Sequence, residues 1–368
     1  MNATQPFLIL NGVGYTSDRL RSGSFESNLN PFEETTLRFC HEWLNQKQDF
    51  QLHTSGSTSI PKKIAITRKQ MEVSASLTIN ALNLKPNYTA LVCLDTKYIA
   101  GQMMLVRSLL LGMNVIAVDP TPNPFEIITS IQSIDFVALV PYQLQTILGS
   151  SSASSFERVK YAIIGGAPLS DIIRKKLPPS GCRFYATYGM TETISHIALQ
   201  PLNGENQTDY FSVLNDIKIG KDERGCLFIQ ADYLSSEKIV TNDLVEIITD
   251  KKFRWLGRWD NIINSGGIKI VPDKVELAVA EVFASLGLPN QFFIAGLPDD
   301  SLSQKVTLVI EGMSFHEDLK TKILIELKSK VGQYELPKEI KFARNFELTE
   351  TGKIRRAETL NLIPASSH

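Results

Sequence analysis

Residues 90–118 read ALVCLDTKYIAGQMMLVRSLLLGMNVIAV, and their pattern predicts a strand, a buried helix and a second strand. The runs 90–94 and 114–118 are short, aliphatic and bounded by polar or turn residues, which is typical of buried strands. Between them, the apolar positions of 101–112 recur with the spacing of a helix that is covered on most sides. A strand, a helix and a strand in this order indicate a parallel sheet.

The same alternation continues toward the middle of the chain and then changes. Further strands are predicted at 136–140, 159–164 and 183–187. From about 217 to 255, short strands alternate with the polar turns 221–225 and 249–252, which predicts antiparallel hairpins. A compact α+β region follows Gly267, with helices at 271–286 and 316–331 and strands at 292–295, 306–310 and 340–344.

We therefore predict an α/β protein with two domains. The large N-terminal domain, residues 1–259, would hold a mostly parallel sheet and an antiparallel β subdomain. The smaller α+β domain would span residues 260–368, because the best boundary lies near Trp259 and Asp260, just before the glycine-bearing turn 264–267.

Composition excludes several classes of function. The chain has 368 residues and a net charge of −1, which gives no reason to expect a nucleic acid as the main partner. Its four cysteines, Cys40, Cys93, Cys182 and Cys226, form neither a CxxC pair nor a metal-ligand spacing. Neither a signal peptide nor a span for membrane insertion is recognisable, since the apolar stretch 103–118 contains Arg107. We expect a cytoplasmic protein.

The segment 54–62 is rich in hydroxyl groups and closes with Pro-Lys. Hydroxyls and backbone N–H groups donate to phosphate oxygens, a glycine lets the backbone approach them closely, and a lysine adds a positive charge. The segment is not a Walker motif, which needs Gly-Lys-Ser/Thr before a helix. By composition alone, a solvated surface turn is the more common interpretation.

Two further motifs directly follow predicted strands. Small residues at 165–168 would let a flat ring lie against the backbone, and the carboxyl ends of parallel strands are where such sheets bind ligands. In the run 188–193, the Tyr188 ring can stack on a base, the Thr191 hydroxyl can reach a phosphate and Glu192 can hold Mg²⁺. The alternatives are an ordinary strand-to-helix turn and a helix N-cap formed by Thr191.

Acidic and basic residues near the domain boundary and the C-terminus complete the candidates. Asp243 could accept hydrogen bonds from ribose hydroxyls, and Arg258 could pair with a phosphate or a hydroxyl. The alternative is a surface salt bridge between Arg258 and Asp243 or Asp260. The run 351–356, which contains Lys353, would by itself be read as a turn with a basic tail.

In this order the motifs resemble the adenylate-forming superfamily of acyl- and aryl-CoA ligases, from Thr54 to Arg356. The resemblance implies that ATP phosphates lie against Thr54, Ser55, Gly56, Ser57, Thr58 and Lys62. It places adenine against Gly165, Gly166, Ala167, Pro168, Tyr188 and Gly189. It makes Lys353, Thr191 and Glu192 catalytic, with Mg²⁺ on Glu192, and it assigns the ribose to Asp243.

The resemblance also implies a mobile C-terminal domain that rotates about Asp260. Ser265, Gly266 and Gly267 would then line part of the channel for coenzyme A. Departures from the family are Ser59, where glycine is usual, and Tyr98, where histidine is usual. Only about 50 residues precede the phosphate motif, so much of the family's N-terminal subdomain is missing.

The short length and the motifs together are most similar to those of compact o-succinylbenzoate–CoA ligases of menaquinone synthesis. Candidate walls of the acid pocket are Tyr98, Gln102, Ser195 and His196. The expected partners are a small carboxylic acid, ATP and CoA, with a homodimer left open. Three alternatives remain: a ligase for another acid, an enzyme that loads a carrier protein, and a non-catalytic nucleotide-binding relative.

Overall fold

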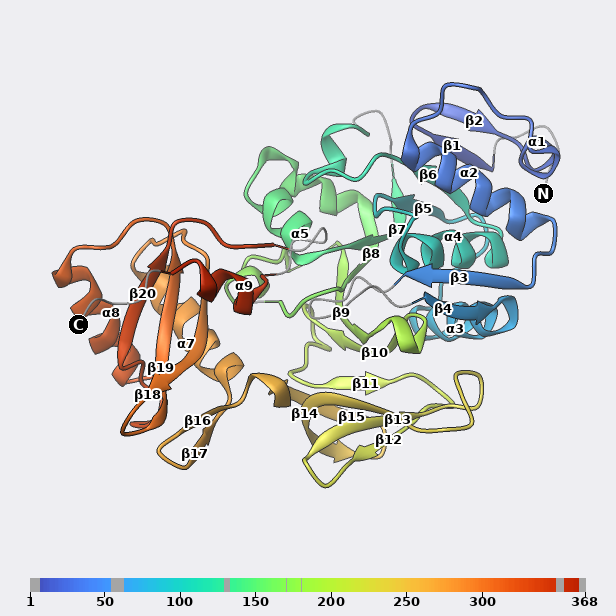
Figure 1. Ribbon diagram of the computed structural model, residues 1–368. Helices are drawn as coiled ribbons and strands as arrows, with labels where there is room; N and C mark the ends of the chain where they lie inside the picture. Colours follow the sequence, from blue (N-terminus) through green and yellow to red (C-terminus); the bar gives the residue numbers. More distant parts are fainter. Residues whose placement is uncertain are drawn as a thin grey trace.

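The computed structural model describes residues 7–53, 63–128, 133–169, 171–179, 181–348 and 354–363. These residues form a large lobe and a smaller C-terminal lobe, which lies at the left of Figure 1. Over the described residues, a thirteen-stranded sheet runs through the large lobe in the order β12-β13-β14-β15-β11-β10-β9-β8-β7-β5-β6-β1-β2.

The centre of this sheet is parallel, as the sequence predicts. Its parallel strands are β1 (Leu8–Leu10), β6 (Asn114–Ala117), β5 (Thr89–Val92), β7 (Ile134–Leu139), β8 (Val159–Ile164) and β9 (Arg183–Gly189). The strand order reverses at β5, because the chain continues to β6 on one side and then to β7 on the other.

Helices cover both faces of the parallel sheet. Alternate residues of β5 join different hydrophobic clusters: Ala90 and Val92 belong to one, and Leu91 belongs to the other. The first cluster includes side chains of α2 (Pro31–Leu44), α3 (Arg68–Leu82) and α4 (Ile99–Leu111). The second includes side chains of η1 (Pro124–Glu126), α5 (Pro141–Leu148) and η2 (Ser151–Arg158).

Antiparallel strands extend the sheet at both ends. On the side of β9 they are β10 (His196–Pro201), β11 (Phe211–Val213), β15 (Lys252–Arg258), β14 (Ile239–Thr249), β13 (Cys226–Gln230) and β12 (Lys218–Lys221). The predicted turns 221–225 and 249–252 are the reversals between β12 and β13 and between β14 and β15. The antiparallel subdomain is therefore confirmed.

A hairpin at the other edge corrects one expectation. The segment 12–14 reads in the sequence as a loop with no strand before it. In the structure β1 precedes it, and Val13 and Gly14 belong to β2 (Val13–Tyr15), which pairs antiparallel with β1. Three-residue strands are too short to show a periodic pattern, so this hairpin left no signal in the sequence.

The smaller lobe has its own sheet and its own apolar core. Its strands are β16 (Ile263–Ser265), β17 (Ile268–Ile270), β18 (Phe292–Asp299), β19 (Ser303–Glu311) and β20 (Glu339–Ala343). Its helices are α7 (Pro272–Ser285), α8 (Glu317–Lys328) and α9 (Arg356–Asn361). The predicted α/β class with an α+β C-terminal region is confirmed, whereas the division at residue 259 and the mobility of the lobe stay predictions.

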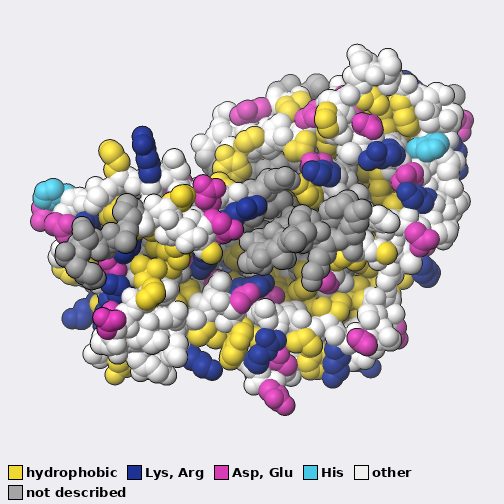
Figure 2. Space-filling view, in the orientation of Figure 1, with side chains coloured by type: hydrophobic (Ala, Val, Ile, Leu, Met, Phe, Trp, Pro, Cys, Tyr) yellow, Lys and Arg dark blue, Asp and Glu magenta, His cyan; other side chains and the backbone are white. Residues whose placement is uncertain are grey.

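Short elements complete the large lobe and the link between the lobes. They are α1 (Ser17–Ser22), β3 (Asp49–His53), β4 (Lys63–Thr67), α6 (Asp171–Lys175), η3 (Thr191–Thr193) and η4 (Trp259–Asn261). Figure 2 shows basic and acidic side chains interspersed over the visible face of both lobes. Among the helices described, none combines the length and the apolar character needed to cross a membrane.

Candidate active site

The two strand-following motifs lie side by side at the carboxyl edge of the parallel sheet. β8 and β9 are parallel neighbours, with Ile164 opposite Ala186. A Cβ atom at Gly165 would lie 2.4 Å from Oγ1 of Thr187, so this position accepts only glycine while the strands keep their spacing. Gly166 has a φ of 93°, which again favours glycine, and residues 166–168 are exposed beside the end of β9. A flat ring can approach the backbone there.

Tyr188 links this edge to the antiparallel part of the sheet. Its hydroxyl donates a hydrogen bond to Oδ2 of Asp243 over 2.6 Å. Its ring meets those of Phe211 and Phe253 edge-on, at centroid distances of 5.8 and 5.1 Å. Burial, reinforced by the charge of Asp243, raises the pKa of Tyr188 well above its ordinary value, so the hydroxyl stays a donor.

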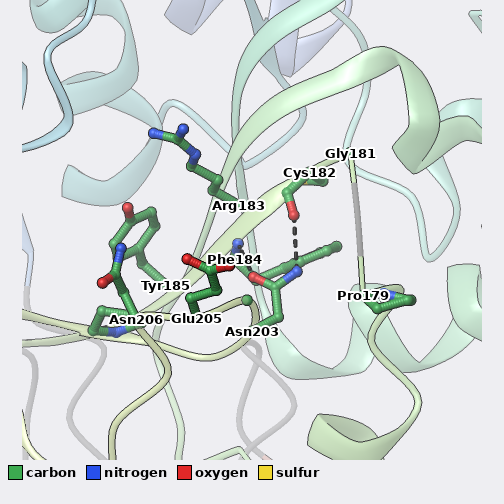
Figure 3. A pocket seen from close by; sticks show the side chains of 11 residues that line it. Pro179, Gly181, Cys182, Arg183, Phe184, Tyr185, Asn203, Glu205 and Asn206 are labelled. Carbon is green, nitrogen blue, oxygen red and sulfur yellow. Dashed lines mark hydrogen bonds between the residues drawn. The ribbon is translucent and has the colours of Figure 1, made fainter.

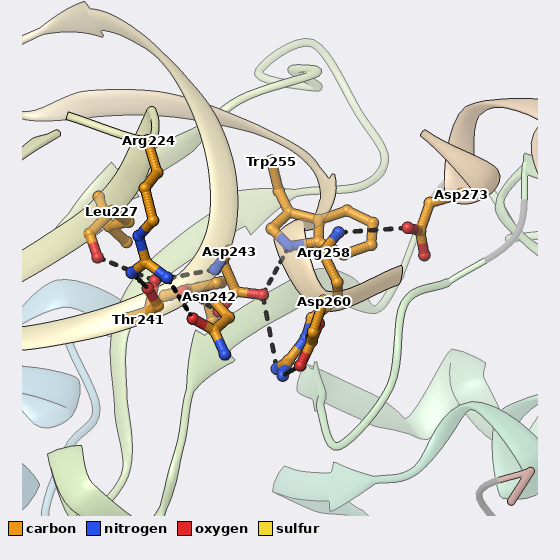
Figure 4. Close-up of polar contacts among 10 residues, drawn as sticks. Arg224, Leu227, Thr241, Asn242, Asp243, Trp255, Arg258, Asp260 and Asp273 are labelled. Carbon is orange, nitrogen blue, oxygen red and sulfur yellow. Dashed lines mark hydrogen bonds and ion pairs between the residues drawn. The ribbon is translucent and has the colours of Figure 1, made fainter. Parts of the chain in front are cut away.

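Asp243 is a buried carboxylate that keeps acceptor capacity. Its other oxygen accepts from Nε1 of Trp255 at 3.1 Å and lies 3.9 Å from Arg258 (Figure 4). Its side chain is 11% exposed. Each carboxylate oxygen can accept about two hydrogen bonds. The two oxygens of Asp243 therefore retain acceptor positions that suit two neighbouring hydroxyl groups, such as those of a ribose.

Arg258 pairs mainly with Asp260. Its Nε and Nη2 donate to the two carboxylate oxygens over 2.9 and 2.6 Å. These bonds hold the pKa of Asp260 below its ordinary value and raise that of Arg258. The salt bridge that the sequence left as an alternative is thus present, and it coexists with the approach of Arg258 to Asp243.

The end of β15 is also where the two lobes meet. The backbone N–H of Arg258 donates to Oδ2 of Asp273, in the first turn of α7, over 3.2 Å (Figure 4). Gly257 has a φ of 142°, and a Cβ there would lie 2.5 Å from Val271 and 2.7 Å from Asp273. Only glycine lets the strand approach α7 so closely. Asp260 follows at once in η4, between the lobes.

The segment after β9 forms a tight turn that presents Glu192 to solvent. Thr193, not Thr191, supplies the hydroxyl that accepts from the backbone N–H of Met190, over 2.9 Å. The alternative reading of Thr191 as an N-cap is therefore wrong. Glu192 is exposed, and within the described residues it has neither a hydrogen-bond nor an ion-pair partner. A free carboxylate of this kind can serve as a magnesium ligand together with phosphate oxygens.

A residue that the sequence analysis did not single out is bonded to Ser195, one of the predicted walls of the acid pocket. Arg107 on α4 is only 1% exposed, and its Nη2 donates to Oγ of Ser195 over 2.7 Å. Its Nε is buried without a partner, as is Oε1 of Gln102 on the same helix. Within the part of the chain described, no carboxylate pairs with Arg107. Burial lowers the pKa of Arg107 to about 9, so it is still a cation at neutral pH.

The other predicted pocket residues lie on α4 and directly after the turn at Glu192. Ser195 and His196 directly follow the turn at Glu192, and His196 is buried. Tyr98 lies half-buried at the N-terminal end of α4, whose N-cap it is. A charged residue in an otherwise apolar helix was the available signal for Arg107. The sequence analysis used it only against a membrane span.

Two predicted motifs fall on residues outside the described part of the chain. They are the phosphate motif at 54–62 and Lys353, and their predicted roles stay predictions. The residues that flank them are described: His53 pairs with Lys63 between β3 and β4, and Leu348 pairs with Ile354. Ser265 ends β16, and Gly266 and Gly267 form the turn to β17 with φ values of 59° and 82°.

Comparison with known proteins identifies the family. A family model described as AMP-binding enzyme matches residues 42–225. The chain belongs to this family. Over 94% of its length it is 41% identical to an acyl-CoA synthetase (AMP-forming)/AMP-acid ligase II-like protein from Dyadobacter fermentans, covering 97% of that chain with a TM-score of 0.62. The predicted adenylate-forming, CoA-ligase superfamily is thereby confirmed.

More distant family members carry a specific name. A 2-succinylbenzoate–CoA ligase of Listeria monocytogenes is 23% identical over 92% of this chain and 75% of its own length. One from Staphylococcus aureus is 26% identical over 83% of this chain and 65% of its own. The Bacillus subtilis O-succinylbenzoate coenzyme A synthetase was solved with ATP and a magnesium ion. It matches with a TM-score of 0.69 at 18% identity, over 84% of this chain and 69% of its own length. At this identity the match supports the fold alone.

A cavity elsewhere in the large lobe does not belong to the site of this AMP-binding enzyme. It has a volume of about 340 Å³ and is lined by residues such as Arg183, Asn203 and Glu205 (Figure 3). Asn203 closes one wall, because its side chain bonds to the backbone of Cys182 and Phe184. These residues lie at the amino end of β9, whereas the motifs lie at its carboxyl end, where parallel sheets bind ligands.

Proposed function

We propose that this protein is an ATP-dependent, AMP-forming acid–CoA ligase whose acid carries a second carboxylate. Our specific candidate is o-succinylbenzoate, which would place the enzyme in menaquinone biosynthesis. The observation that carries the proposal is Arg107, a buried cation that has no carboxylate partner among the described residues. The names of the 2-succinylbenzoate–CoA ligases that the chain is similar to support the same acid.

The position of Arg107 fits recognition of the acid. A buried ion without a partner is costly, whereas a carboxylate brought by a ligand would compensate it and accept from its free N–H groups. Ser195, to which Arg107 donates, lies three positions after Glu192. In our proposal the distal carboxylate at Arg107 and the reacting carboxylate near Glu192 belong to one small molecule.

The proposed reaction has two steps. An oxygen of the reacting carboxylate attacks the α-phosphorus of ATP, and pyrophosphate leaves with the electrons of the broken bond. The CoA thiol, having lost its proton, then attacks the acyl carbon and AMP leaves. Activation is needed because a free carboxylate would have to expel oxide, whereas AMP is a good leaving group.

Charge neutralisation is the main catalytic task, because the acid and ATP are both anionic. In our proposal Lys353 bridges the reacting carboxylate and the α-phosphate, while residues 54–62 hold the pyrophosphate. A magnesium ion held by Glu192 and phosphate oxygens would neutralise further negative charge. Asp243, held by the Tyr188 hydroxyl, would fix the ribose, and the adenine would lie against Tyr188 and residues 165–168.

The second step would use a different arrangement of the lobes. We propose that rotation about Asp260 withdraws Lys353 and brings the turn 265–267 to the channel for CoA. Arg258 and Asp273, which join the lobes in the described arrangement, would then separate. Gly266 and Gly267, the exposed residues of this turn, suit the close passage of a narrow chain.

CoA-dependent production of AMP with o-succinylbenzoate tests the proposal directly. We expect turnover with this acid and much less with its half-ester, in which the distal carboxylate is esterified. Turnover of another acid and none of o-succinylbenzoate would contradict the narrow assignment. Adenylate without a CoA thioester would indicate carrier loading, and no pyrophosphate release with any acid of a panel would indicate a non-catalytic relative.

A further inference from the structure

A chain of hydrogen bonds runs from Arg107 into the core of the large lobe. Nη2 of Arg107 donates to Oγ of Ser195 over 2.7 Å, and that oxygen lies 3.5 Å from Nδ1 of His196. Nε2 of His196 lies 3.0 Å from Oγ1 of Thr78, on α3. Thr78 in turn donates to the backbone carbonyl of Ser74 over 3.4 Å. Thr78 and His196 are both buried.

The direction of each bond follows from the two ends of this chain. Arg107 has only donors, so Ser195 must accept from it and is free to donate its own hydrogen to Nδ1 of His196. At the other end Thr78 can donate to the carbonyl of Ser74 over 3.4 Å and accept from Nε2 of His196, or it can donate to Nε2 over 3.0 Å. We assign the first arrangement, a neutral imidazole with its hydrogen on Nε2, because only then can the Ser195 hydroxyl donate its hydrogen to Nδ1.

We propose that His196 and Thr78 are positioning residues that fix the Ser195 hydroxyl and thereby aim Arg107 at the distal carboxylate of the acid. This inference rests on the proposed function and adds the residues that set its selectivity. With its hydrogen committed to His196, Ser195 presents a lone pair to Arg107. Among the described residues the guanidinium is held through Nη2, and its unpartnered Nε–H is left for the ligand.

The backbone around Ser195 is built to hold this geometry. Ile194, directly before it, has a φ of 66°, which is a strained conformation for a β-branched residue. Thr193 stabilises the turn by donating to the carbonyl of Ser195 over 2.8 Å. A Cβ at Gly189 would lie 2.5 Å from that same carbonyl oxygen. Strain of this kind persists where the surroundings fix it, and it is common at ligand sites.

The environment of His196 keeps the imidazole neutral, as the chain of bonds requires. Burial, together with the positive charge of Arg107, lowers the pKa of His196 well below its ordinary value. A protonated His196 would carry hydrogens on both ring nitrogens and would have no acceptor for the hydrogen of Ser195. The neutral imidazole with its hydrogen on Nε2 thus leaves Nδ1 free to accept from Ser195.

Thr78→Val tests the inference, because valine keeps the shape and removes the hydroxyl. Ser76→Ala is the matched control: Ser76 lies on the same helix and donates to the carbonyl of Glu72 in the same way, over 2.8 Å. Thr78→Ser restores the hydroxyl. We would measure kcat and KM for o-succinylbenzoate and for its half-ester, with saturating ATP and CoA, in the full-length protein.

For Thr78→Val we expect KM for the diacid to rise roughly three- to tenfold, the effect of one net hydrogen bond, with kcat nearly unchanged. KM for the half-ester should stay the same, Ser76→Ala should resemble the wild type, and Thr78→Ser should restore the diacid KM. An equal change for both acids, or the same change in Ser76→Ala, would overturn the inference.

Nitrogen NMR of the histidines provides a readout that is independent of turnover. With the signal of His196 assigned through His196→Gln, we expect a neutral ring with its hydrogen on Nε2, and a mixture of tautomers in Thr78→Val. A hydrogen on Nδ1 in the wild type would overturn the inference. Failure of the wild type to use the diacid would overturn the proposed function and this inference together, whereas an unchanged selectivity in Thr78→Val overturns this inference alone.

Discussion

Replacing Arg107 by methionine should have opposite effects on activity and on stability. Methionine fills a similar buried volume but offers no charge and no hydrogen-bond donor. In the ligand-free protein, Arg107 is a buried cation with an unpartnered Nε and no carboxylate partner among the described residues. The cost of that burial would be recovered only when the acid binds. Arg107→Met therefore removes both the free-energy cost of burying the charge and the favourable interaction of that charge with the bound acid.

The magnitudes follow from the contacts. Loss of charge-assisted hydrogen bonds to the distal carboxylate costs about 3 kcal/mol, which is roughly a 150-fold loss in kcat/KM for the diacid. Replacement of buried ion pairs by apolar side chains is neutral or stabilising by about 1–4 kcal/mol, and we expect about 2 kcal/mol for the single buried cation Arg107. Ser195 loses the hydrogen bond from Arg107, which reduces this gain in stability by about 1 kcal/mol. We expect a net gain of about 1 kcal/mol in the free energy of unfolding.

The assay combines turnover with urea unfolding of the ligand-free protein. The half-ester serves as the control substrate, and its kcat/KM should change little in Arg107→Met. Arg107→Lys keeps the charge without the planar fork, so we expect an intermediate loss for the diacid. A variant that is destabilised and retains its preference for the diacid would refute the reasoning, because Arg107 would then be a structural residue.

Three further perturbations test other parts of the proposed site. Lys353→Ala should slow adenylate formation about a hundred- to thousandfold and spare thioester formation from pre-made acyl-adenylate. An equal loss in both half-reactions would count against the proposed role of Lys353 in the first step. Tyr188→Phe removes the hydroxyl bound to Asp243, so KM for ATP should rise roughly three- to tenfold at constant kcat, and an unchanged KM would contradict this. Arg258 lowers the pKa of Asp260, so ionised Asp260 stabilises the fold above its unfolded-state pKa of about 3.9, and this contribution is lost as pH falls. Arg258→Gln should therefore make urea unfolding less dependent on pH in the acid range, and an unchanged dependence would show that other carboxylates dominate.

Local patterns in the sequence predicted the regular part of the fold well. β8 begins and ends at the predicted residues 159 and 164, and β6 ends one residue early, at Ala117. These elements were predictable because their apolar runs are bounded by turn residues. β1, β2 and β11 were missed, because strands of three residues show no alternation and depend on their neighbours in the sheet. The longer β3, β4 and β10 and the helices α2 and α3 were not predicted either.

The candidate site was predictable where a motif is continuous and unpredictable where it depends on distant contacts. Residues 165–168 and 188–192 meet because their strands are adjacent, and this could be inferred from the alternation of strands and helices. The bond from Arg107 to Ser195 spans 88 positions, and the contact of Thr78 with His196 spans 118. No local pattern reports such pairs. Trp255, which donates to Asp243, was missed for the same reason.

The shortness of β11 has a consequence for how the enzyme would respond to its nucleotide. β11 forms a short seam within the antiparallel part of the sheet, where it pairs with Ala198 and Leu199 of β10 on one side and with Lys252 and Phe253 of β15 on the other. Residues 165–168 lie on one side of this seam, and Asp243 lies on the other. A nucleotide that contacts both residues 165–168 and Asp243 would hold the strands on the two sides of β11 together. Backbone amides of β11 should then exchange with deuterated solvent more slowly when ATP is present, although no atom of β11 need touch it.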